Sequence, residues 1–346
     1  MTIPRRAITS SEFESLLVSS SSFIDVRAPI EFSSGSLPGA VNLPLLSDEE
    51  RHEVGLTYRQ LGQEAAISTG HRLVAGDIRA GRTQSWLNHI QKHPESILYC
   101  FRGGLRSQTV QKWLGEKGVD RPLIEGGYKA LRRFLLEVLE HRISKLQFLV
   151  VGGATGSGKT RYLYSTSAPC IDLEKLAVHR GSAFGALESP QPSQASFENS
   201  LAIELLKLPT THSPILIENE SQRIGRCTIP QAFFSKIQSS PKITLAVPLE
   251  QRVENIYQDY ILNSSLGLRG DALRFAQFRR ALIAISKKLG SQRSEVLLNN
   301  LATSEKEFRL NGTLESNRVW IQKLLVWYYD PLYQKSAKAR EPRAEG

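Results

Sequence analysis

Short apolar runs bounded by glycine, proline or polar residues recur along the first 250 residues of the chain. They lie at 21–28, 97–100, 122–128, 146–153, 169–174, 213–220 and 242–249. Segments with helical spacing of apolar residues separate several of them, notably 107–118 and 128–142. Strands that alternate with helices in this way indicate parallel sheets covered by helices, and therefore an α/β fold.

From about residue 250 the pattern becomes mainly helical, with apolar faces at 251–261, 271–290 and 316–333. We place a domain boundary near residue 140, which suits a length of 346 residues at roughly 150 residues per domain. The prediction is a parallel-sheet domain at 1–140 and a second α/β domain with a helical C-terminal region at 141–333. The tail 334–346 has almost no apolar residues and is predicted to be disordered.

Charge and cysteine usage narrow the class of protein. Lys and Arg number 44 against 34 Asp and Glu, a net charge of +10 that favours a polyanionic partner or phosphorylated substrates. An inert basic surface is the alternative. The three cysteines, Cys100, Cys170 and Cys227, form no CxxC pair, which argues against structural zinc or a disulfide framework and favours a reducing compartment.

Targeting signals are not evident in the sequence. The N-terminal segment lacks the apolar core of a secretory signal, and no run approaches 18 uninterrupted apolar residues. We therefore expect a cytoplasmic protein with no membrane partner.

A cysteine stands where the apolar run at 97–100 ends. Two glycines can curl the following backbone into an anion-binding nest, and two arginines and the start of a helix would add positive potential. A thiolate facing such a cradle suits transfer of a sulfur, selenium or phosphoryl group. The alternative is that Cys100 is a small buried core residue. The candidate loop consists of Cys100, Phe101, Arg102, Gly103, Gly104, Leu105, Arg106 and Ser107.

A second glycine-rich loop follows the apolar run at 146–153 and precedes a predicted helix. It satisfies G-x-x-x-x-G-K-[ST], which predicts a P-loop NTPase-like domain whose loop amides bind a diphosphate. Lys159 would neutralise the diphosphate, and the Thr160 hydroxyl could hold Mg²⁺. A tight turn without a ligand is the alternative. The loop consists of Gly153, Ala154, Thr155, Gly156, Ser157, Gly158, Lys159 and Thr160.

The acidic residue that would position a metal beside this loop is not obvious. Glu218 and Glu220, or Asp172 and Glu174, lie near strand ends, but neither pair follows the usual apolar-run-then-Asp pattern. We therefore assign no metal ligand, and the loop indicates a diphosphate more firmly than ATP. Candidate substrate or tRNA contacts in the polar segments of this half, which would otherwise be ordered loops and solvated carboxylates, are His179, Arg180, Ser182, Glu218, Glu220 and Arg223.

The N-terminal region resembles the rhodanese family. The stretch 25–45 carries that signature at Asp25, Arg27, Glu31, Gly35, Gly39, Ala40, Asn42 and Pro44, with Ser36 in place of the usual histidine. In this family the loop cysteine carries a persulfide. The spacing C-x5-R from Cys100 to Arg106 is one residue longer than in simple sulfurtransferases and suits a tetrahedral phosphorus. Cysteine phosphatases share this spacing but place a histidine before the cysteine, where this chain has Tyr99.

The combination of both loops with further motifs at 172–185, 192–199, 217–225 and 328–333 resembles the tRNA 2-selenouridine synthases over nearly the whole chain. This resemblance implies an enzyme, a transferase that acts on tRNA carrying 2-thiouridine at the wobble position. It would geranylate the sulfur from geranyl diphosphate, then replace the geranylthio group with selenium from selenophosphate, which a partner synthetase supplies.

The same resemblance implies roles for the two loops. The P-loop would hold the diphosphate of the prenyl donor, and Cys100 with its arginines would receive selenophosphate. No bound cofactor is assigned, and Mg²⁺ stays an optional ion. Three other classes stay open: a rhodanese-type sulfurtransferase fused to a P-loop kinase, a cysteine phosphatase, and a non-catalytic tRNA-binding module.

Overall fold

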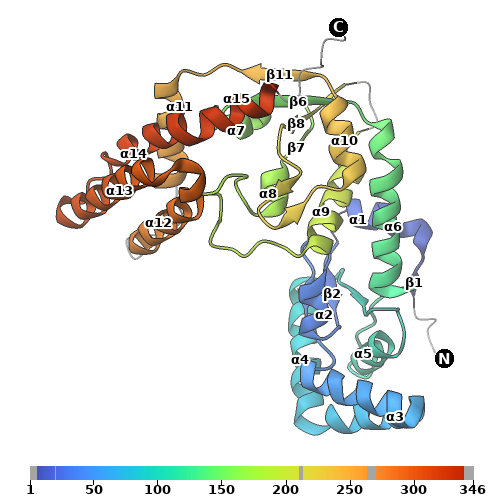
Figure 1. The fold of residues 1–346 in the computed structure, drawn as a ribbon. Helices are drawn as coiled ribbons and strands as arrows, with labels where there is room; N and C mark the ends of the chain where they lie inside the picture. The colour runs from blue at the N-terminus through green and yellow to red at the C-terminus, as the bar shows by residue number, and fades with distance from the viewer. Residues whose placement is uncertain (1–5, 20, 210–212, 263–269, 339–346) are drawn as a thin grey trace. The chain divides into compact units, whose positions relative to one another are not determined.

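The computed structural model describes residues 6–19, 21–209, 213–262 and 270–338 of the chain (Figure 1). They form two compact units. The first unit contains residues 1–146, 191–210 and 226–233, and the second contains 147–190, 211–225 and 234–346. The second half of the chain thus supplies two segments to the first unit.

The first unit is built on a five-stranded parallel sheet, as the apolar runs predict. Its strands, in spatial order, are β1 (Ala7–Ile8), β5 (Leu123–Ile124), β4 (Ile97–Tyr99), β2 (Phe23–Asp25) and β3 (Val41–Asn42). The three runs expected from the sequence form the three inner strands. Parallel strands place all their carboxyl ends at one edge, so the residue after β4, Cys100, lies at that edge.

Helices cover this sheet on both faces. The helices of the unit are α1 (Phe13–Val18), α2 (Pro29–Ser34), α3 (Asp48–Leu73), α4 (Gly76–Lys92), α5 (Leu105–Gly115), α6 (Gly127–His141) and α9 (Gln194–Lys207), with the 3-10 turns η1 (Ser10–Glu12) and η2 (Ile143–Lys145). The short strand β10 (Cys227–Thr228) also belongs to this unit. Ile24 and Leu98 pack with Trp86 of α4 and Trp113 of α5 on one face. On the other face the ring of Tyr99 stacks on Tyr128 of α6, because successive strand residues point to opposite faces.

Helix α9 packs against α6 within the first unit. Its N-terminus is capped by Ser193, whose hydroxyl accepts a hydrogen bond from the Ser196 amide. Arg132 of α6 donates to the Asn199 side chain of α9 at 2.8 Å and pairs with Glu198. The segment that follows the second glycine-rich loop in sequence therefore helps to build the cysteine-containing unit.

The rhodanese-like signature residues form a buried ion pair. Asp25 and Arg27 are 0% and 2% exposed, and Arg27 Nη2 lies 2.5 Å from Asp25 Oδ2. Arg27 also donates to the Gly35 carbonyl at 2.7 Å, and its guanidinium stacks 4.0 Å from the centre of the Tyr128 ring. The Asn42 amide donates to the backbone carbonyls of Asp25 and Arg27. These residues hold the ends of β2 and β3 together beneath the cysteine loop.

The second unit contains a four-stranded parallel sheet, also as predicted. Its strands, in spatial order, are β11 (Lys242–Leu245), β6 (Phe148–Gly153), β8 (Ile215–Glu218) and β7 (Cys170–Ile171). Helices α7 (Lys159–Ser165) and α8 (Leu173–Ala177) and the short strand β9 (Arg223–Ile224) accompany it, and α10 (Gln231–Ser239) begins in the first unit and ends in this one.

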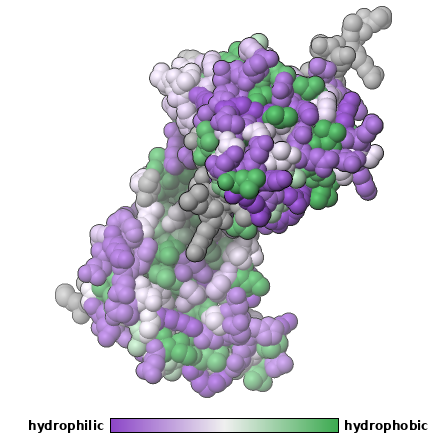
Figure 2. Space-filling model, turned by 90° about the vertical axis from the view of Figure 1, so that its left-hand side faces the viewer, coloured by the Kyte–Doolittle hydropathy of each residue, from purple (hydrophilic) through white to green (hydrophobic). Residues whose placement is uncertain are grey.

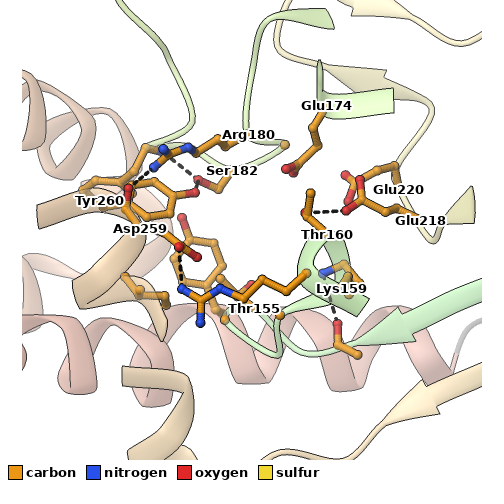
Figure 3. Close-up of a pocket in the computed structure, with 18 of the residues that line it drawn as sticks. Thr155, Lys159, Thr160, Glu174, Arg180, Ser182, Glu218, Glu220, Asp259 and Tyr260 are labelled. Carbon is orange, nitrogen blue, oxygen red and sulfur yellow. Dashed lines mark hydrogen bonds and ion pairs between the residues drawn. The ribbon is translucent and has the colours of Figure 1, made fainter. Parts of the chain in front are cut away.

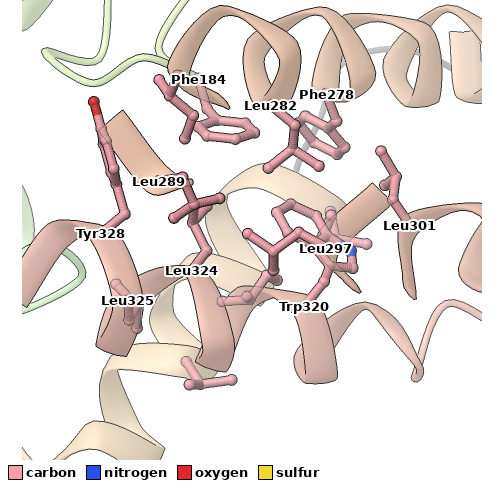
Figure 4. Packing of buried hydrophobic residues seen from close by; sticks show 14 of the residues in the cluster. Phe184, Phe278, Leu282, Leu289, Leu297, Leu301, Trp320, Leu324, Leu325 and Tyr328 are labelled. Atoms are coloured by element: carbon pink, nitrogen blue, oxygen red, sulfur yellow. The ribbon is translucent and has the colours of Figure 1, made fainter. Parts of the chain in front are cut away.

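The remaining helices form a layer with its own core (Figure 4). They are α11 (Leu249–Ile256), the π-helical turn η3 (Tyr257–Leu262), α12 (Gly270–Leu289), α13 (Ser291–Asn311), α14 (Asn317–Leu324), the π-helical turn η4 (Leu325–Tyr329) and α15 (Asp330–Lys338). This confirms the helical C-terminal region. The predicted disordered tail is wrong at 334–338, which continue α15, and the rest of it, 339–346, lies outside the described residues.

The surface in Figure 2 is mainly hydrophilic on the face shown, with hydrophobic residues in small groups between polar ones. Among the helices that the structure describes, none combines the length and the apolar character that crossing a bilayer would require.

The buried Asp25–Arg27 pair gives a stability prediction. Asp25→Asn leaves the Arg27 charge buried without its counter-charge, so we expect the opening free energy of the first sheet to fall by about 3 kcal/mol. Hydrogen–deuterium exchange of peptides covering β2 and β4 measures this opening. The matched control is Glu53→Gln, which removes the exposed Arg72–Glu53 pair and should cost less than about 1 kcal/mol. Unchanged exchange in Asp25→Asn would contradict the assigned role.

Candidate functional site

The glycine-rich loop of the second unit runs from the end of β6 to the start of α7. Gly156 has a φ of +83°, and a Cβ at this position would lie 2.8 Å from the Arg252 carbonyl, so no other residue fits there without strain. Arg252 of α11 donates to the Thr155 carbonyl at 2.9 Å, and the Asn255 amide donates to the Gly156 carbonyl at 2.8 Å. Helix α11 therefore fixes the conformation of the loop.

A cavity of about 1230 Å³ lies against this loop, entirely within the second unit. The predicted residues that line it are Gly153, Thr155, Gly156, Gly158, Lys159, Thr160, His179, Arg180, Ser182, Glu218 and Glu220. Ala154 and Ser157 are not among its described lining residues, although they belong to the loop, and Ser157 is buried. Arg223 is exposed on β9 and is not among them either. Most of the site residues predicted in the second half of the chain therefore line a single cavity.

Three carboxylates meet beside the loop (Figure 3). Glu174, Glu218 and Glu220 each offer an oxygen, and these oxygens all lie within 4.8 Å of one another. Glu218 ends β8, is 1% exposed, and accepts a 2.5 Å hydrogen bond from the Thr160 hydroxyl through Oε1. Its Oε2 is buried and has no hydrogen-bond partner within the described part of the chain. Sequence reasoning proposed Glu218 and Glu220 as contacts and considered Glu174 without choosing it.

Burial and mutual repulsion make these carboxylates hold protons strongly. Burial first, and then the charges of Glu218 and Glu220, raise the pKa of Glu174 to about 9 against the opposing effect of Lys159. Burial, with Asp172 and Glu220, raises the pKa of Glu218 to about 8, and burial also raises that of Glu220. A divalent cation would relieve this repulsion. Carboxylate and hydroxyl oxygens are the donors that Mg²⁺ prefers, so the residues present fit such an ion.

The wall opposite the carboxylates joins the predicted Arg180 to Arg161, Asp259 and Tyr260, which were not predicted from the sequence (Figure 3). Arg180 donates to the Asp259 carbonyl at 2.6 Å, and its guanidinium lies 4.6 Å from the centre of the Tyr260 ring. Arg161 pairs with the Asp259 carboxylate at 2.6 Å. Burial raises the pKa of Tyr260 to about 12, so its hydroxyl stays protonated and available as a donor. Asp259 and Tyr260 lie on the π-helical turn η3, a feature that apolar spacing does not reveal.

The cysteine loop lies at the end of β4 in the first unit. Cys100 is 3% exposed, and its Sγ lies 3.2 Å from the Ser107 hydroxyl at the start of α5. Gly103 has a φ of +66°, and a Cβ there would lie 2.7 Å from the Ile124 carbonyl, so the turn requires glycine. The Cys100 carbonyl accepts a 2.8 Å hydrogen bond from the Tyr128 amide, which joins the loop to α6. The loop is therefore tightly closed around the thiol.

The two arginines of this loop have different surroundings. Arg106 forms a bidentate pair with Glu31 at 2.5 and 3.1 Å, and Arg51 of α3 binds the same carboxylate at 3.0 Å. Burial alone would raise the pKa of Glu31, but the hydrogen bonds and charges of the two arginines lower it below its ordinary value. Arg102 is exposed. Glu31 thus orients Arg106 as one wall of a cavity.

That cavity measures about 1030 Å³ and lies within the first unit. The loop lines it with Phe101, Arg102, Leu105 and Arg106, and helix α3 lines it with Arg51, His52, Tyr58 and Arg59. Cys100 is not one of the described residues that line it. The described lining has six arginines and one carboxylate, that of Glu31; Arg27 and Arg132 pair with Asp25 and Glu198 outside the lining, and the remaining four arginines against Glu31 keep it cationic. Sequence analysis did not predict α3, because only Ala66 along its 26 residues is buried and no apolar stripe marks it.

Comparison with known proteins covers both units. A family model described as the tRNA 2-selenouridine synthase AAA domain matches residues 146–345, and a model of the rhodanese-like domain matches residues 9–133. The chain is 45% identical to a tRNA 2-selenouridine synthase of Nitrosomonas europaea, an alignment that covers 95% of this chain and 92% of the relative. It is 47% identical to one of Bdellovibrio bacteriovorus, with 92% and 89% covered. It is 42% identical to one of Pseudomonas syringae pv. tomato, with 98% and 94% covered.

The carboxylate cluster predicts how pH changes stability. Its folded-state pKa values are raised, so between about 4.5 and about 9 the native protein binds more protons than the unfolded chain. Without metal, the contribution of these groups to stability is therefore fully present at low pH and is lost as the pH rises through this window. A cation that displaces the protons should bind more tightly at high pH. Thermal unfolding with and without Mg²⁺ or Mn²⁺, at about pH 6 and about pH 9, measures both effects.

The variant for this prediction is Glu218→Gln, which removes one charge and keeps the side-chain shape. We expect the unfolding temperature of this variant to fall less as the pH rises, and Mg²⁺ or Mn²⁺ to raise it less than in the unaltered protein. Glu250→Gln, at an exposed position of α11, is the matched control and should behave as the unaltered protein. A metal response that is equal at both pH values and in Glu218→Gln would refute the assignment of the cluster.

Proposed function

The chain belongs to the tRNA 2-selenouridine synthase family, and on that basis we propose that it converts 2-thiouridine in tRNA to 2-selenouridine in two transfers. In the first, the sulfur is geranylated from geranyl diphosphate. In the second, selenium from selenophosphate replaces the geranylthio group. The observation that carries this proposal is that one chain has two anion-suited cavities of different chemistry, one beside Lys159 and one beside the loop of Cys100.

In the first transfer the bond between geranyl carbon and diphosphate oxygen breaks, and the diphosphate leaves with the electron pair. The thiouridine sulfur forms the new bond to that carbon, and the nucleobase releases its N3 proton. Lys159 and the backbone amides of the loop stabilise the charge on the leaving group. Glu174, Glu218, Glu220 and Thr160 would hold Mg²⁺, which supplies further positive charge to the diphosphate.

In the second transfer the cationic cavity of the first unit binds selenophosphate. Arg51 and Arg106 lie on its wall and offset the phosphate charge. The Cys100 thiol, in the loop that lines this cavity, assists the transfer of selenium to the base. The selenium of selenophosphate bonds to C2 of the base as the carbon–sulfur bond breaks, and the sulfur takes a proton and departs as geranylthiol. Water then attacks the phosphorus, the phosphorus–selenium bond breaks with its electron pair on selenium, and inorganic phosphate leaves. Basic side chains hold the tRNA mainly through its phosphates, consistent with a net charge of +10.

A second candidate is a sulfurtransferase fused to a P-loop kinase. It is favoured by Glu218, which ends β8 and accepts a hydrogen bond from Thr160, because nucleotide-hydrolysing enzymes hold Mg²⁺ with such an acid–hydroxyl pair. This candidate requires ATP turnover, whereas the first requires none.

The test supplies thiolated tRNA with geranyl diphosphate and then selenophosphate, and analyses the nucleosides by mass spectrometry. Lys159→Ala should lower geranylation by at least about 100-fold, the loss expected for a group that stabilises developing charge. Cys100→Ala should geranylate normally and form no selenated nucleoside. The matched controls are Lys236→Ala, on α10, and Cys227→Ala, a buried cysteine without a glycine loop.

Two outcomes would count against this scheme. Loss of geranylation in folded Cys100→Ala would contradict the division of labour between the loops. ATP hydrolysis that depends on Lys159, with no prenylated nucleoside, would establish the kinase candidate in its place.

A further inference from the structure

The cavity beside the phosphate loop also has an apolar wall. The helical layer and the loop before it supply this wall through Phe184, Phe278, Trp320, Ile321, Leu324 and Leu325. These residues belong to the hydrophobic core of the layer, and all are at least nine-tenths buried. The same cavity is therefore lined by charged side chains near β6, α7 and β8, and by apolar side chains from α12, α14 and η4.

Three aromatic rings close this wall (Figure 4). The centres of Phe278 and Trp320 lie 5.3 Å apart, and Phe184 lies 6.1 Å from the first and 6.0 Å from the second. The Trp320 indole N–H donates to the side-chain oxygen of Asn317, which is fully buried. The only polar atom of the Trp320 side chain is therefore satisfied inside α14, and what the residue offers the cavity is hydrocarbon.

This wall discriminates between classes of diphosphate ester. A nucleoside would bring ribose hydroxyls and base nitrogens, which lose hydrogen bonds with water when buried against hydrocarbon. A branched hydrocarbon chain has no hydrogen bonds with water to lose, and burying it against this wall removes apolar surface from water. Because interiors pack densely, three interlocked rings also limit how far such a chain can extend.

We propose that Phe184, Phe278 and Trp320 form the floor of a prenyl pocket and set the chain length of the transferred group, so that geranyl fits and a longer prenyl chain is blocked. This inference rests on the proposed function and deepens it, since it names the residues that select the donor. They are specificity-determining residues in the part of the cavity away from the diphosphate.

The experiment offers geranyl diphosphate and farnesyl diphosphate together with thiolated tRNA, and mass spectrometry gives the ratio of the two products. In Phe278→Ala and Phe184→Ala the space of a ring becomes available. We expect the ratio of farnesylated to geranylated nucleoside to rise at least about tenfold over the unaltered protein, as removal of pocket contacts typically allows. Should either alanine variant fail to fold, Phe278→Leu and Phe184→Leu replace them. The same ratio should rise in these variants too, but by a smaller factor, because leucine frees less space than alanine.

Phe275→Ala is the matched control. Phe275 lies one turn before Phe278 on α12 and is equally buried, at 3% against 4% exposed, but it packs against Phe308 and is not among the described lining residues. It should lose comparable stability and keep the product ratio. Geranylated product with an unchanged ratio in both cavity variants would overturn the inference alone. No prenylated nucleoside from the unaltered protein would overturn the proposed function, and with it this inference.

Discussion

Arg252 connects the phosphate loop to the helices of the second unit. Its Nε donates to the Thr155 carbonyl at 2.9 Å, and its two terminal nitrogens bind the Asp330 carboxylate at 3.2 and 2.5 Å. It is 7% exposed, so these bonds satisfy a charge that would otherwise be costly to bury. Because one side chain binds both the loop and the start of α15, the diphosphate end of the cavity and its apolar wall keep a fixed separation. A ligand that fills both ends then meets a preorganised site.

The electrostatics beside the loop explain why Lys159 alone would be insufficient. A diphosphate placed next to Glu174, Glu218 and Glu220 would meet three carboxylates within a few ångströms of one another. Raised pKa values reduce this repulsion by keeping protons on the cluster, and a divalent cation reduces it further by adding charge of the opposite sign. The first unit solves the same problem differently. There Glu31 is outnumbered by the arginines that line the cavity, and although burial alone would raise the pKa of Glu31, its pairing with Arg106 and the charge of Arg51 lower it.

The sequence was informative where function depends on contiguous residues. Cys100 directly follows β4, and Lys159 and Thr160 begin α7 after the short loop that follows β6. Both loops need glycine for reasons that act over a few residues, as at Gly103 and Gly156. The three inner strands of the first sheet and all four strands of the second could also be predicted, since they lie in short apolar runs, whereas the two-residue edge strands β1 and β3 were not predicted.

Features that depend on distant parts of the chain could not be predicted. Glu174 joins Glu218 only because β7 pairs with β8, and Phe184 meets Trp320 only because the helical layer folds over a loop far earlier in the sequence. Helix α3 begins at a cap in which the Ser47 hydroxyl accepts a hydrogen bond from the Glu50 amide, it is kinked at Gly62, and no apolar face marks it in the sequence. Its arginines become significant only when the cavity they line has formed.

The apolar wall also bears on the chemistry proposed for the first transfer. Departure of diphosphate from an allylic carbon leaves positive charge on the hydrocarbon, and water would capture it. Side chains that are nearly fully buried exclude water from that part of the cavity. Aromatic rings do so without adding a competing nucleophile. In the proposed binding mode Phe184, Phe278 and Trp320 lie at the hydrocarbon end of the donor, away from the allylic carbon. Their part in the first transfer is therefore to exclude water from the chain, whereas the charge that develops beside the diphosphate is left to Lys159 and the loop amides.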